Sequence, residues 1–176
     1  FLLNIGLAEH QADWNYAGIK SPFARLYYVT DGFATVRTLD QTIELKPNYL
    51  YLIPPFTLHS DMCTAYFRLY YMHVYFKPGN GLGLFEQYQM PCEVVASEAD
   101  LPIVERIAYI NPNRELQRYD PKWYDNSASL LQNLSFSSHA AVGASVETIG
   151  LLMQLLSRFL NHAQPKLLST DSRILA

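Results

Sequence analysis

The sequence predicts a mainly β domain followed by C-terminal helices, and three observations lead to this prediction. Tyr and Phe, which favour strands, number 13 and 9, and most of them precede Gln89. In the same region, short runs that alternate apolar and polar side chains are separated by turn residues such as Asp31-Gly32. After Ala96 the apolar residues instead recur every three or four positions, which is the spacing of an amphipathic helix. The 176 residues are enough for one domain with its own core.

Strands are expected along most of the first 96 residues. Residues 1–19 show partial alternation followed by polar and turn-forming residues, and they predict a strand and a loop. Residues 25–29 predict a strand that ends at the turn of residues 30–32. Further strands are expected at residues 33–38, 43–45, 49–53, 66–76 and 92–96. Together they indicate a series of short antiparallel strands.

The strand at residues 66–76 has two chemically different faces, because successive side chains in a strand point to opposite sides. One face carries Tyr66, Arg68, Tyr70, Met72, Val74 and Phe76, and the other carries Phe67, Leu69, Tyr71, His73 and Tyr75. The second face combines hydroxyl and imidazole groups with flat apolar rings, as a pocket for a polyhydroxylated molecule would.

Two helices are expected after residue 96. Ser97 followed by Asp100 is typical of a helix start, and an apolar stripe follows until Asn111-Pro112. Residues 114–138 leave two alternatives open, a helical turn or a packed loop. The final helix carries one apolar stripe of Val142, Val146, Ile149, Met153, Leu156 and Leu160 and a second of Leu151, Leu152, Leu155 and Phe159.

The two stripes of the final helix predict a homodimer. One stripe can seat the helix on the domain, and the other then needs a second partner; a wholly buried helix is the alternative. We expect Val146, Ile149, Met153, Leu156 and Leu160 at the dimer interface. The expected organisation is a barrel with an N-terminal arm at residues 1–96, a helical dimerisation segment at 97–163 and a linker at 164–176.

Composition excludes several classes of function. The net charge of −3, without a run of Lys or Arg, argues against nucleic-acid binding by these residues. Cys63 and Cys92 form no C-x-x-C motif and are expected to be reduced thiols. No apolar run reaches 18 residues and no signal peptide is evident, so we expect a cytoplasmic protein without a membrane partner.

The order of the motifs resembles a known family. R-L-Y-Y-V-T-D-G from Arg25, L-K-P-N-Y-L-Y-L-I-P-P-F-T-L-H from Leu45 and Y-F-R-L-Y-Y-M-H-V-Y-F from Tyr66, followed by a long helix, resemble the effector-binding domain of AraC-type transcription regulators. The resemblance implies a cupin-like barrel, that is, a double-stranded β-helix or jelly roll, followed by a helical dimerisation segment. It also implies DNA binding by a helix-turn-helix region that these residues lack.

The cupin motif G-x5-P-x-G-x2-H can be laid on this sequence without a gap. Asn48 and Phe56 then take the two glycine positions, while Pro54 and His59 match. Setting Gly32 on the glycine of the other cupin motif puts Arg25 at the metal-binding Glu and residues 18–21 across the two metal-binding histidines. A divalent metal needs three or four ligands, so we expect no metal, no cofactor and no catalytic residues.

The resemblance implies an effector pocket on the inward face of the strand at residues 66–76. It nominates Tyr71 and His73, and less directly Tyr75, as ligand-binding residues. Alternation along residues 25–31 places Arg25, Tyr27 and Asp31 on one face as further candidates. Trp14, on the arm that would rearrange over the pocket, and His59 complete the set.

Each of these candidates has a structural alternative. Tyr27 and Tyr75 can be core aromatics, and His59 can bond a neighbouring backbone group. Arg25 can pair with a surface acid such as Asp31 or Glu44.

Three hypotheses follow for the function. The first is the sensor and dimerisation module of a transcription regulator, which binds a small-molecule effector, with a carbohydrate expected because aromatic rings stack on sugars while Arg, Asp and His bond hydroxyls. The second is a metal-dependent small cupin enzyme, an isomerase or dioxygenase. The third is a barrel with a filled interior that serves only as a dimer scaffold.

Overall fold

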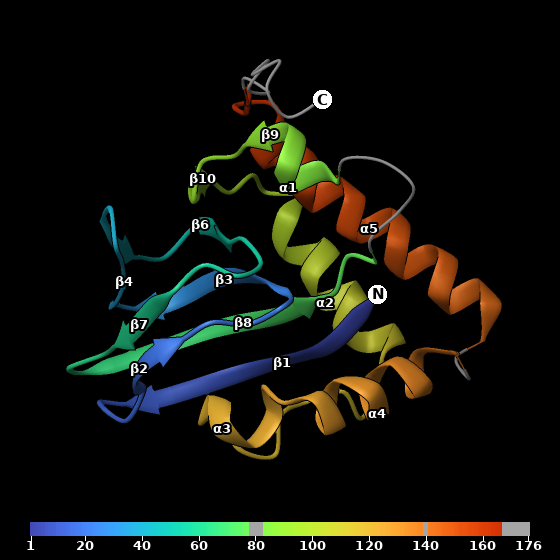
Figure 1. Cartoon of the computed structure of the whole chain (residues 1–176), viewed down its shortest axis with the longest axis horizontal. Helices are drawn as coiled ribbons and strands as arrows, with labels where there is room; N and C mark the ends of the chain where they lie inside the picture. Colours follow the sequence, from blue (N-terminus) through green and yellow to red (C-terminus); the bar gives the residue numbers. More distant parts are fainter. Residues whose placement is uncertain (78–82, 139–140, 167–176) are drawn as a thin grey trace, which may run out of the picture.

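The computed structural model describes residues 1–77, 83–138 and 141–166, and its centre is a sandwich of two antiparallel sheets (Figure 1). The first sheet has the order β1 (Leu2–Gln11), β8 (Tyr66–Val74), β3 (Ala24–Gly32), β6 (Tyr49–Ile53) and β10 (Glu93–Val95). The second has the order β2 (Asn15–Ile19), β7 (His59–Met62), β4 (Ala34–Thr38) and β5 (Thr42–Leu45).

The strand order is that of a jelly roll. From β1 to β8, each strand lies in the opposite sheet from the one before it, except that β4 and β5 form a hairpin within the second sheet. Two four-stranded sheets connected in this way make a double-stranded β-helix, the architecture of cupins. The predicted class, a cupin-like barrel followed by helices, is therefore confirmed.

Three backbone positions preserve the turns of the cupin motifs. Gly32 has a φ of +70°, and a side chain there would collide with the carbonyl oxygen of Tyr66. Asn48 and Phe56, which occupy the motif's two glycine positions, have φ values of +66° and +61°. Both positions have the left-handed conformation that glycine favours, although neither residue is glycine; Asn tolerates this conformation and Phe is strained in it.

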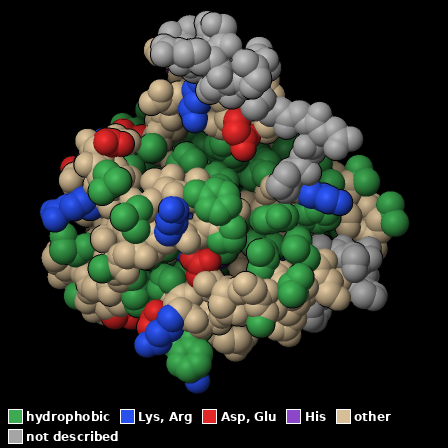
Figure 2. Space-filling model, in the orientation of Figure 1, with side chains coloured by type: hydrophobic (Ala, Val, Ile, Leu, Met, Phe, Trp, Pro, Cys, Tyr) green, Lys and Arg blue, Asp and Glu red, His purple; other side chains and the backbone are tan. Residues whose placement is uncertain are grey.

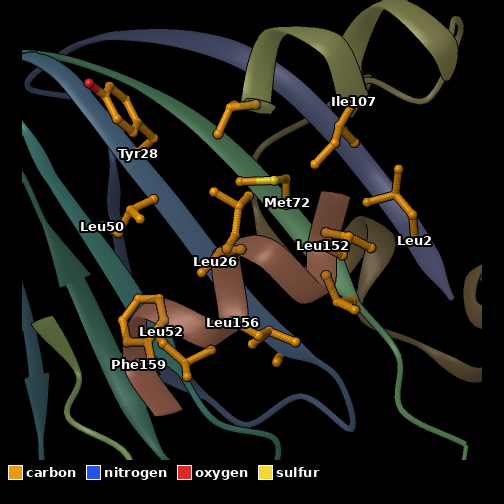
Figure 3. Packing of buried hydrophobic residues seen from close by; sticks show 14 of the residues in the cluster. Leu2, Leu26, Tyr28, Leu50, Leu52, Met72, Ile107, Leu152, Leu156 and Phe159 are labelled. Atoms are coloured by element: carbon orange, nitrogen blue, oxygen red, sulfur yellow. The ribbon is translucent and has the colours of Figure 1, made fainter. Parts of the chain in front are cut away.

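Two helices, α2 (Asp100–Ile110) and α5 (Val142–Leu160), cover the outer face of the first sheet (Figures 1 and 3). The start predicted for the first of them is present, since the Asp100 carboxylate accepts a hydrogen bond of 2.7 Å from the Ser97 amide. Side chains from the strands and from both helices form one apolar core, which includes Leu26, Tyr28, Leu50, Leu52, Met72, Ile107, Leu152, Leu155, Leu156 and Phe159.

Shorter elements complete the fold. The segment left open by the sequence contains α3 (Pro121–Tyr124) and α4 (Ser127–Ser138), and α4 contacts β1. α1 (Leu84–Gln87) precedes β9 (Tyr88–Gln89), which pairs with β11 (Gln164–Pro165). The linker expected at 164–176 thus begins as a short strand, and residues 167–176 lie outside the described residues.

The N-terminal segment differs from its prediction as a strand and a loop. β1 pairs with β8 along its length, and residues 15–19 form β2 in the second sheet. The expected arm is therefore part of both sheets. β7 was also not identified from the sequence. Its run of four residues is too short and too polar to give a clear strand pattern.

The outward stripe of α5 is largely as predicted. Val146, Ile149 and Met153 are 63%, 53% and 48% exposed. Leu156 is 3% exposed and packs in the core, so its assignment to the dimer interface is wrong; it lies beside Leu155 on the side of α5 that faces the sheet. Leu160 is partly buried against the same core. None of the helices in the described part of the chain is long and apolar enough to span a membrane.

Candidate functional site

The candidate site lies between the two sheets, on the inner face of β3 and β8. Arg25 pairs with His73 across these strands, and Tyr27 pairs with Tyr71, so that four of the predicted residues lie in two adjacent cross-strand pairs. All four side chains are at most 5% exposed. The predicted alternation of β8 is confirmed, because Leu69, Tyr71 and His73 face this interior while Met72 and Val74 face the helices.

Arg25 is the centre of the site. Its Nη1 donates to the Tyr124 hydroxyl at 2.8 Å and to Nε2 of His73 at 3.2 Å, and its Nη2 donates to the Ser21 hydroxyl at 2.7 Å. Nη2 also lies 3.3 Å from the Asp125 carboxylate. The acid that pairs with Arg25 is therefore Asp125 on the segment after α3, rather than Asp31 or Glu44.

Two of the interior histidines, His73 and His59, are neutral. His73 Nε2 accepts from Arg25, a group that can only donate, and burial together with the Arg25 charge holds the pKa of His73 well below its usual range. His59 Nδ1 donates to the Thr57 carbonyl at 2.8 Å, the neighbouring-backbone bond considered as its alternative role. Burial lowers the pKa of His59 to about 4, which leaves its Nε2 as an acceptor.

Asp61 is a site residue that the sequence analysis missed. It lies two positions after His59 on β7, faces the interior and is 4% exposed. Burial raises its pKa to about 7, although the Arg25 charge opposes this shift. Alternation from His59 was the signal available for finding it, had β7 been recognised as a strand.

Three buried polar atoms of this interior have no hydrogen-bond partner among the described residues: Arg25 Nε, His59 Nε2 and Asp61 Oδ1. His59 Nε2 and Asp61 Oδ1 lie 3.8 Å apart, too far for a hydrogen bond. Buried polar groups without partners are costly in free energy, and they are commonly satisfied by water or a ligand. The interior therefore has unused capacity to bind a polar molecule.

The site is closed by residues 114–125, which we call the plug. The Leu116 amide donates to the Tyr71 hydroxyl at 2.7 Å, and the Tyr119 ring lies edge-on to Tyr71 and His10. The Tyr124 ring stacks on His73, with centroids 5.1 Å apart and an interplanar angle of 21°. The cavity left between plug and barrel has a volume of about 20 Å³, room for about one water molecule.

The remaining predicted residues lie in different places. Trp14 lines the interior cavity beside Tyr27, at 6% exposure, as part of the barrel wall rather than of an arm above it. Asp31 is exposed, because a bulge between Val29 and Asp31 interrupts the alternation of β3, and the prediction that it shares the Arg25 face is wrong. Tyr75 follows the end of β8, is partly buried and does not line the cavity.

Tyr124 and Asp125 also escaped the sequence analysis. They lie about 100 residues from Arg25 in the sequence, within the segment whose structure was left open, and no local pattern connects them to the barrel. Ser21 was identified only as a position that replaces a cupin histidine; its hydroxyl bonds both Arg25 and Asp125.

The donor set of the interior does not resemble a metal centre. In the described residues, no group of three or more His, Cys, Asp or Glu side chains is arranged to hold a metal ion. His59 and Asp61 alone offer free ligand atoms, and the guanidinium of Arg25 faces them as a competing cation.

Comparisons with known proteins return structural likenesses alone. Neither the protein-family models nor the curated proteins contain a match. Among solved structures, the chain is similar to a cupin superfamily protein from Desulfitobacterium hafniense, at 19% identity and a TM-score of 0.38 over 41% of this chain and 66% of the other. It is also similar to a cupin-2 domain protein from Shewanella frigidimarina, at 17% identity and a TM-score of 0.36 over 40% of this chain and 68% of the other.

A third similar structure is ToxT from Vibrio cholerae bound to an unsaturated fatty acid. Its identity is 10% and its TM-score 0.42, over 77% of this chain and 53% of the ToxT chain. The alignments therefore span about two thirds of the two cupin chains and about half of ToxT. All three TM-scores lie below 0.5.

Proposed function

We propose that this chain is the ligand-sensing and dimerisation domain of an AraC-type transcription regulator, and that it binds a small-molecule effector between its sheets. In this proposal the protein acts in the cytoplasm, has no catalytic residues, and binds DNA only through the helix-turn-helix region that the resemblance implies. The motif order along residues 25–76 supports the family. The observation that carries the binding role is the buried polar cluster around Arg25, which holds three unpartnered polar atoms.

The position of this cluster supports sensing. Arg25, near the start of β3, and His73, near the end of β8, lie opposite each other on two paired strands, and the sheet fixes their positions. The plug that covers them belongs to a separate segment with short helices. A ligand can operate a switch only by binding one arrangement more tightly than another, and a rigid site under a separate cover offers two such arrangements.

The exposed stripe of α5 supports the homodimer. Val142, Val146, Ile149 and Met153 are all at least 48% exposed on one side of a helix whose opposite side is buried. Hydrophobic side chains gather over the right half of the face drawn in Figure 2, where α5 lies in Figure 1. A contiguous exposed apolar stripe is typical of a protein–protein contact.

The binding role is tested by titrating candidate effectors, sugars included, while following Trp14 fluorescence in a Trp123→Phe chain. Trp14 lines the interior, so a bound molecule should change its emission. His73→Ala should weaken binding without changing the oligomeric state measured by sedimentation. Binding that is unaffected by this substitution would place the effector elsewhere and contradict the proposal.

A metal-dependent small cupin enzyme is the second candidate, and the free His59 Nε2 and Asp61 Oδ1 are the observation that favours it. It predicts stoichiometric metal in the purified protein. Elemental analysis separates the two candidates: iron, manganese, nickel or zinc at one equivalent per chain, lost in His59→Ala, would replace the sensing role with the catalytic one.

A further inference from the structure

The plug presents two chemical groups to the site. The first is the Tyr124 phenol, whose ring stacks on His73 and whose hydroxyl accepts a hydrogen bond from Arg25 Nη1 at 2.8 Å. The second is the Asp125 carboxylate, which accepts from the Ser21 hydroxyl and pairs with Arg25 Nη2 at 3.3 Å. A flat ring and a carboxylate thus occupy the place where an effector would contact Arg25 and His73.

The plug is attached less firmly than the barrel wall. α3 has four residues and none of them is buried, and its Lys122 and Trp123 are exposed. Asp125 is 12% exposed, whereas Arg25 beneath it is 2% exposed. Segments with short helices and few buried side chains open at a lower free-energy cost than core strands. The plug is therefore the part of the site that can move away from the barrel.

Removal of the plug would leave the Arg25 charge without its carboxylate partner. The other groups bonded to the guanidinium, Ser21 and His73, are neutral. Asp61 faces Arg25 from β7, but its Oδ1 has no hydrogen-bond partner among the described residues. Burial raises the pKa of Asp61 to about 7, so this carboxyl carries only part of a negative charge at neutral pH. In the described part of the chain, Asp125 is the carboxylate within 4 Å of the guanidinium, and loss of such a close partner of a buried cation is unfavourable. An anionic ligand restores this pairing, and an uncharged ligand does not.

We propose that the interior site binds a small planar aromatic carboxylate in the place of Tyr124 and Asp125, so that ligand and plug compete for Arg25 and His73. The inference rests on the sensing role proposed above and specifies its ligand class. The ligand's carboxylate takes over the pairing of Asp125 with Arg25 and Ser21, and its ring takes over the stacking of Tyr124 on His73. A neutral sugar supplies neither group.

The test uses 4-hydroxybenzoate as the probe and the Trp123→Phe chain, in which Trp14 is the remaining tryptophan. Binding is measured by isothermal titration calorimetry, and Trp14 fluorescence reports whether the probe enters the interior. Two matched probes separate the contributions: 4-hydroxybenzamide keeps the ring but loses the charge, and cyclohexanecarboxylate keeps the charge but loses the flat ring. We expect each to bind at least tenfold more weakly than 4-hydroxybenzoate.

Variants test the competition. Tyr124→Ala removes the plug's ring and should tighten 4-hydroxybenzoate binding at least tenfold, while Lys122→Ala, an exposed neighbour in α3, should leave it unchanged. Asp125→Asn removes the carboxylate that pairs with Arg25 Nη2 and should tighten binding of the acid but not of the amide. Arg25→Gln should abolish binding; circular dichroism checks that it folds, and the Asp125→Asn result stands independently if it does not.

The outcomes separate this inference from the sensing role. The ligand class is wrong if the amide binds as tightly as the acid, or if sugars change Trp14 fluorescence and the acid does not; sensing then stands. The competition is wrong if Tyr124→Ala and Asp125→Asn bind the acid no more tightly than the parent chain. The sensing role itself fails if no acid, amide or sugar binds either the parent chain or Tyr124→Ala.

Discussion

The two faces of the first sheet are built from the same strands but do different things. On β3, Leu26 and Tyr28 point outward into a mainly apolar core made with α2 and α5 (Figure 3). Asp100 and Thr148 of these helices are also buried, and Asp100 pairs with Arg158. On the same strand, Arg25 and Tyr27 point inward, beside His73 and Tyr71 of β8. One face excludes water with apolar side chains, and the other buries charge and hydrogen-bonding groups.

The difference shows where the chain stabilises its fold and where it gives up stability. Apolar burial on the outer face contributes about 25 cal/mol for each Å² removed from water. Between the sheets, Arg25 of β3 and His59 and Asp61 of β7 each keep a buried polar atom without a hydrogen-bond partner among the described residues, and such atoms cost about 1–3 kcal/mol each. A polar interior maintained against this cost is typical of a binding site.

Truncation of the outer core should give the largest loss of stability. Phe159 is fully buried between α5 and the sheet, so Phe159→Ala should lower the free energy of unfolding by about 3–5 kcal/mol. Met153→Ala, on the exposed side of the same helix, should change it by less than about 0.5 kcal/mol. Urea unfolding measures both, and equal losses would show that the buried side of α5 is not a core.

Removal of the Asp61 carboxyl should change how stability depends on pH. Its pKa is raised to about 7, so between pH 4 and 7 the folded chain holds a proton that the unfolded chain has released. The contribution of Asp61 to stability therefore falls as pH rises through this window. The parent chain loses this stability as the pH rises, and Asp61→Asn does not. The free energy of unfolding of Asp61→Asn minus that of the parent chain should therefore increase by on the order of 3 kcal/mol between pH 4 and 8.

The comparison with the parent chain isolates Asp61 from its titratable and charged neighbours. Arg25, Tyr27, His59 and Tyr16 are present in both proteins, so their own contributions cancel to first order. Asp40→Asn, in the exposed turn between β4 and β5, controls for the loss of one carboxylate. A flat difference between Asp61→Asn and the parent chain across this pH range would mean that Asp61 is not buried as described.

Loss of the Tyr71 hydroxyl should loosen the plug without affecting the outer core. Tyr71→Phe leaves the Leu116 amide without its 2.7 Å acceptor, a loss of about 1 kcal/mol, or about fivefold faster hydrogen exchange at that amide. Gly6→Ala should act in the same direction, because a Cβ there would lie 2.5 Å from the Tyr71 oxygen. Tyr70→Phe, on the outer face, is the control, and faster exchange there too would contradict a local role.

A charge on the exposed stripe of α5 should have the smallest effect on folding and a clear effect on assembly. Met153→Glu is expected to separate the dimer, because it buries an unpaired charge in the contact, while the unfolding free energy of the monomer changes by about 0.5 kcal/mol or less. Sedimentation velocity measures the first and urea unfolding at low concentration the second. Gln154→Glu adds the same charge beside the stripe, and a dimer that survives both substitutions would place the interface elsewhere.

Much of the architecture could be predicted because it depends on neighbouring residues. The alternation of β8 assigns Tyr71 and His73 to one face and Met72 to the other, since successive side chains of a strand must point to opposite sides. Residues 142–160 were predicted as a helix and form α5 over those residues, because their apolar spacing and the absence of an interior Pro leave no competing structure.

The failures occur where a local rule is interrupted or a pattern is too short. The bulge after Val29 moves Asp31 out of the face of Arg25, and periodicity does not reveal a bulge. Leu156 fits the outward stripe by spacing but lies at the edge between two stripes, where the position of the sheet decides its burial. β7 has four residues, so its His59 and Asp61 were not recognised as neighbours on one face.

The sequence by itself determined most of the longer strands, the two helices that cover the first sheet, and the two chemistries that alternate along β3 and β8. The tertiary structure alone decided that Asp125 and Tyr124, about 100 residues away, satisfy this arginine and fill the interior. The physical reason is the separation along the sequence over which each effect acts. Backbone geometry fixes which side a residue faces from its immediate neighbours, whereas the partner of a buried charge depends on how distant segments pack around it.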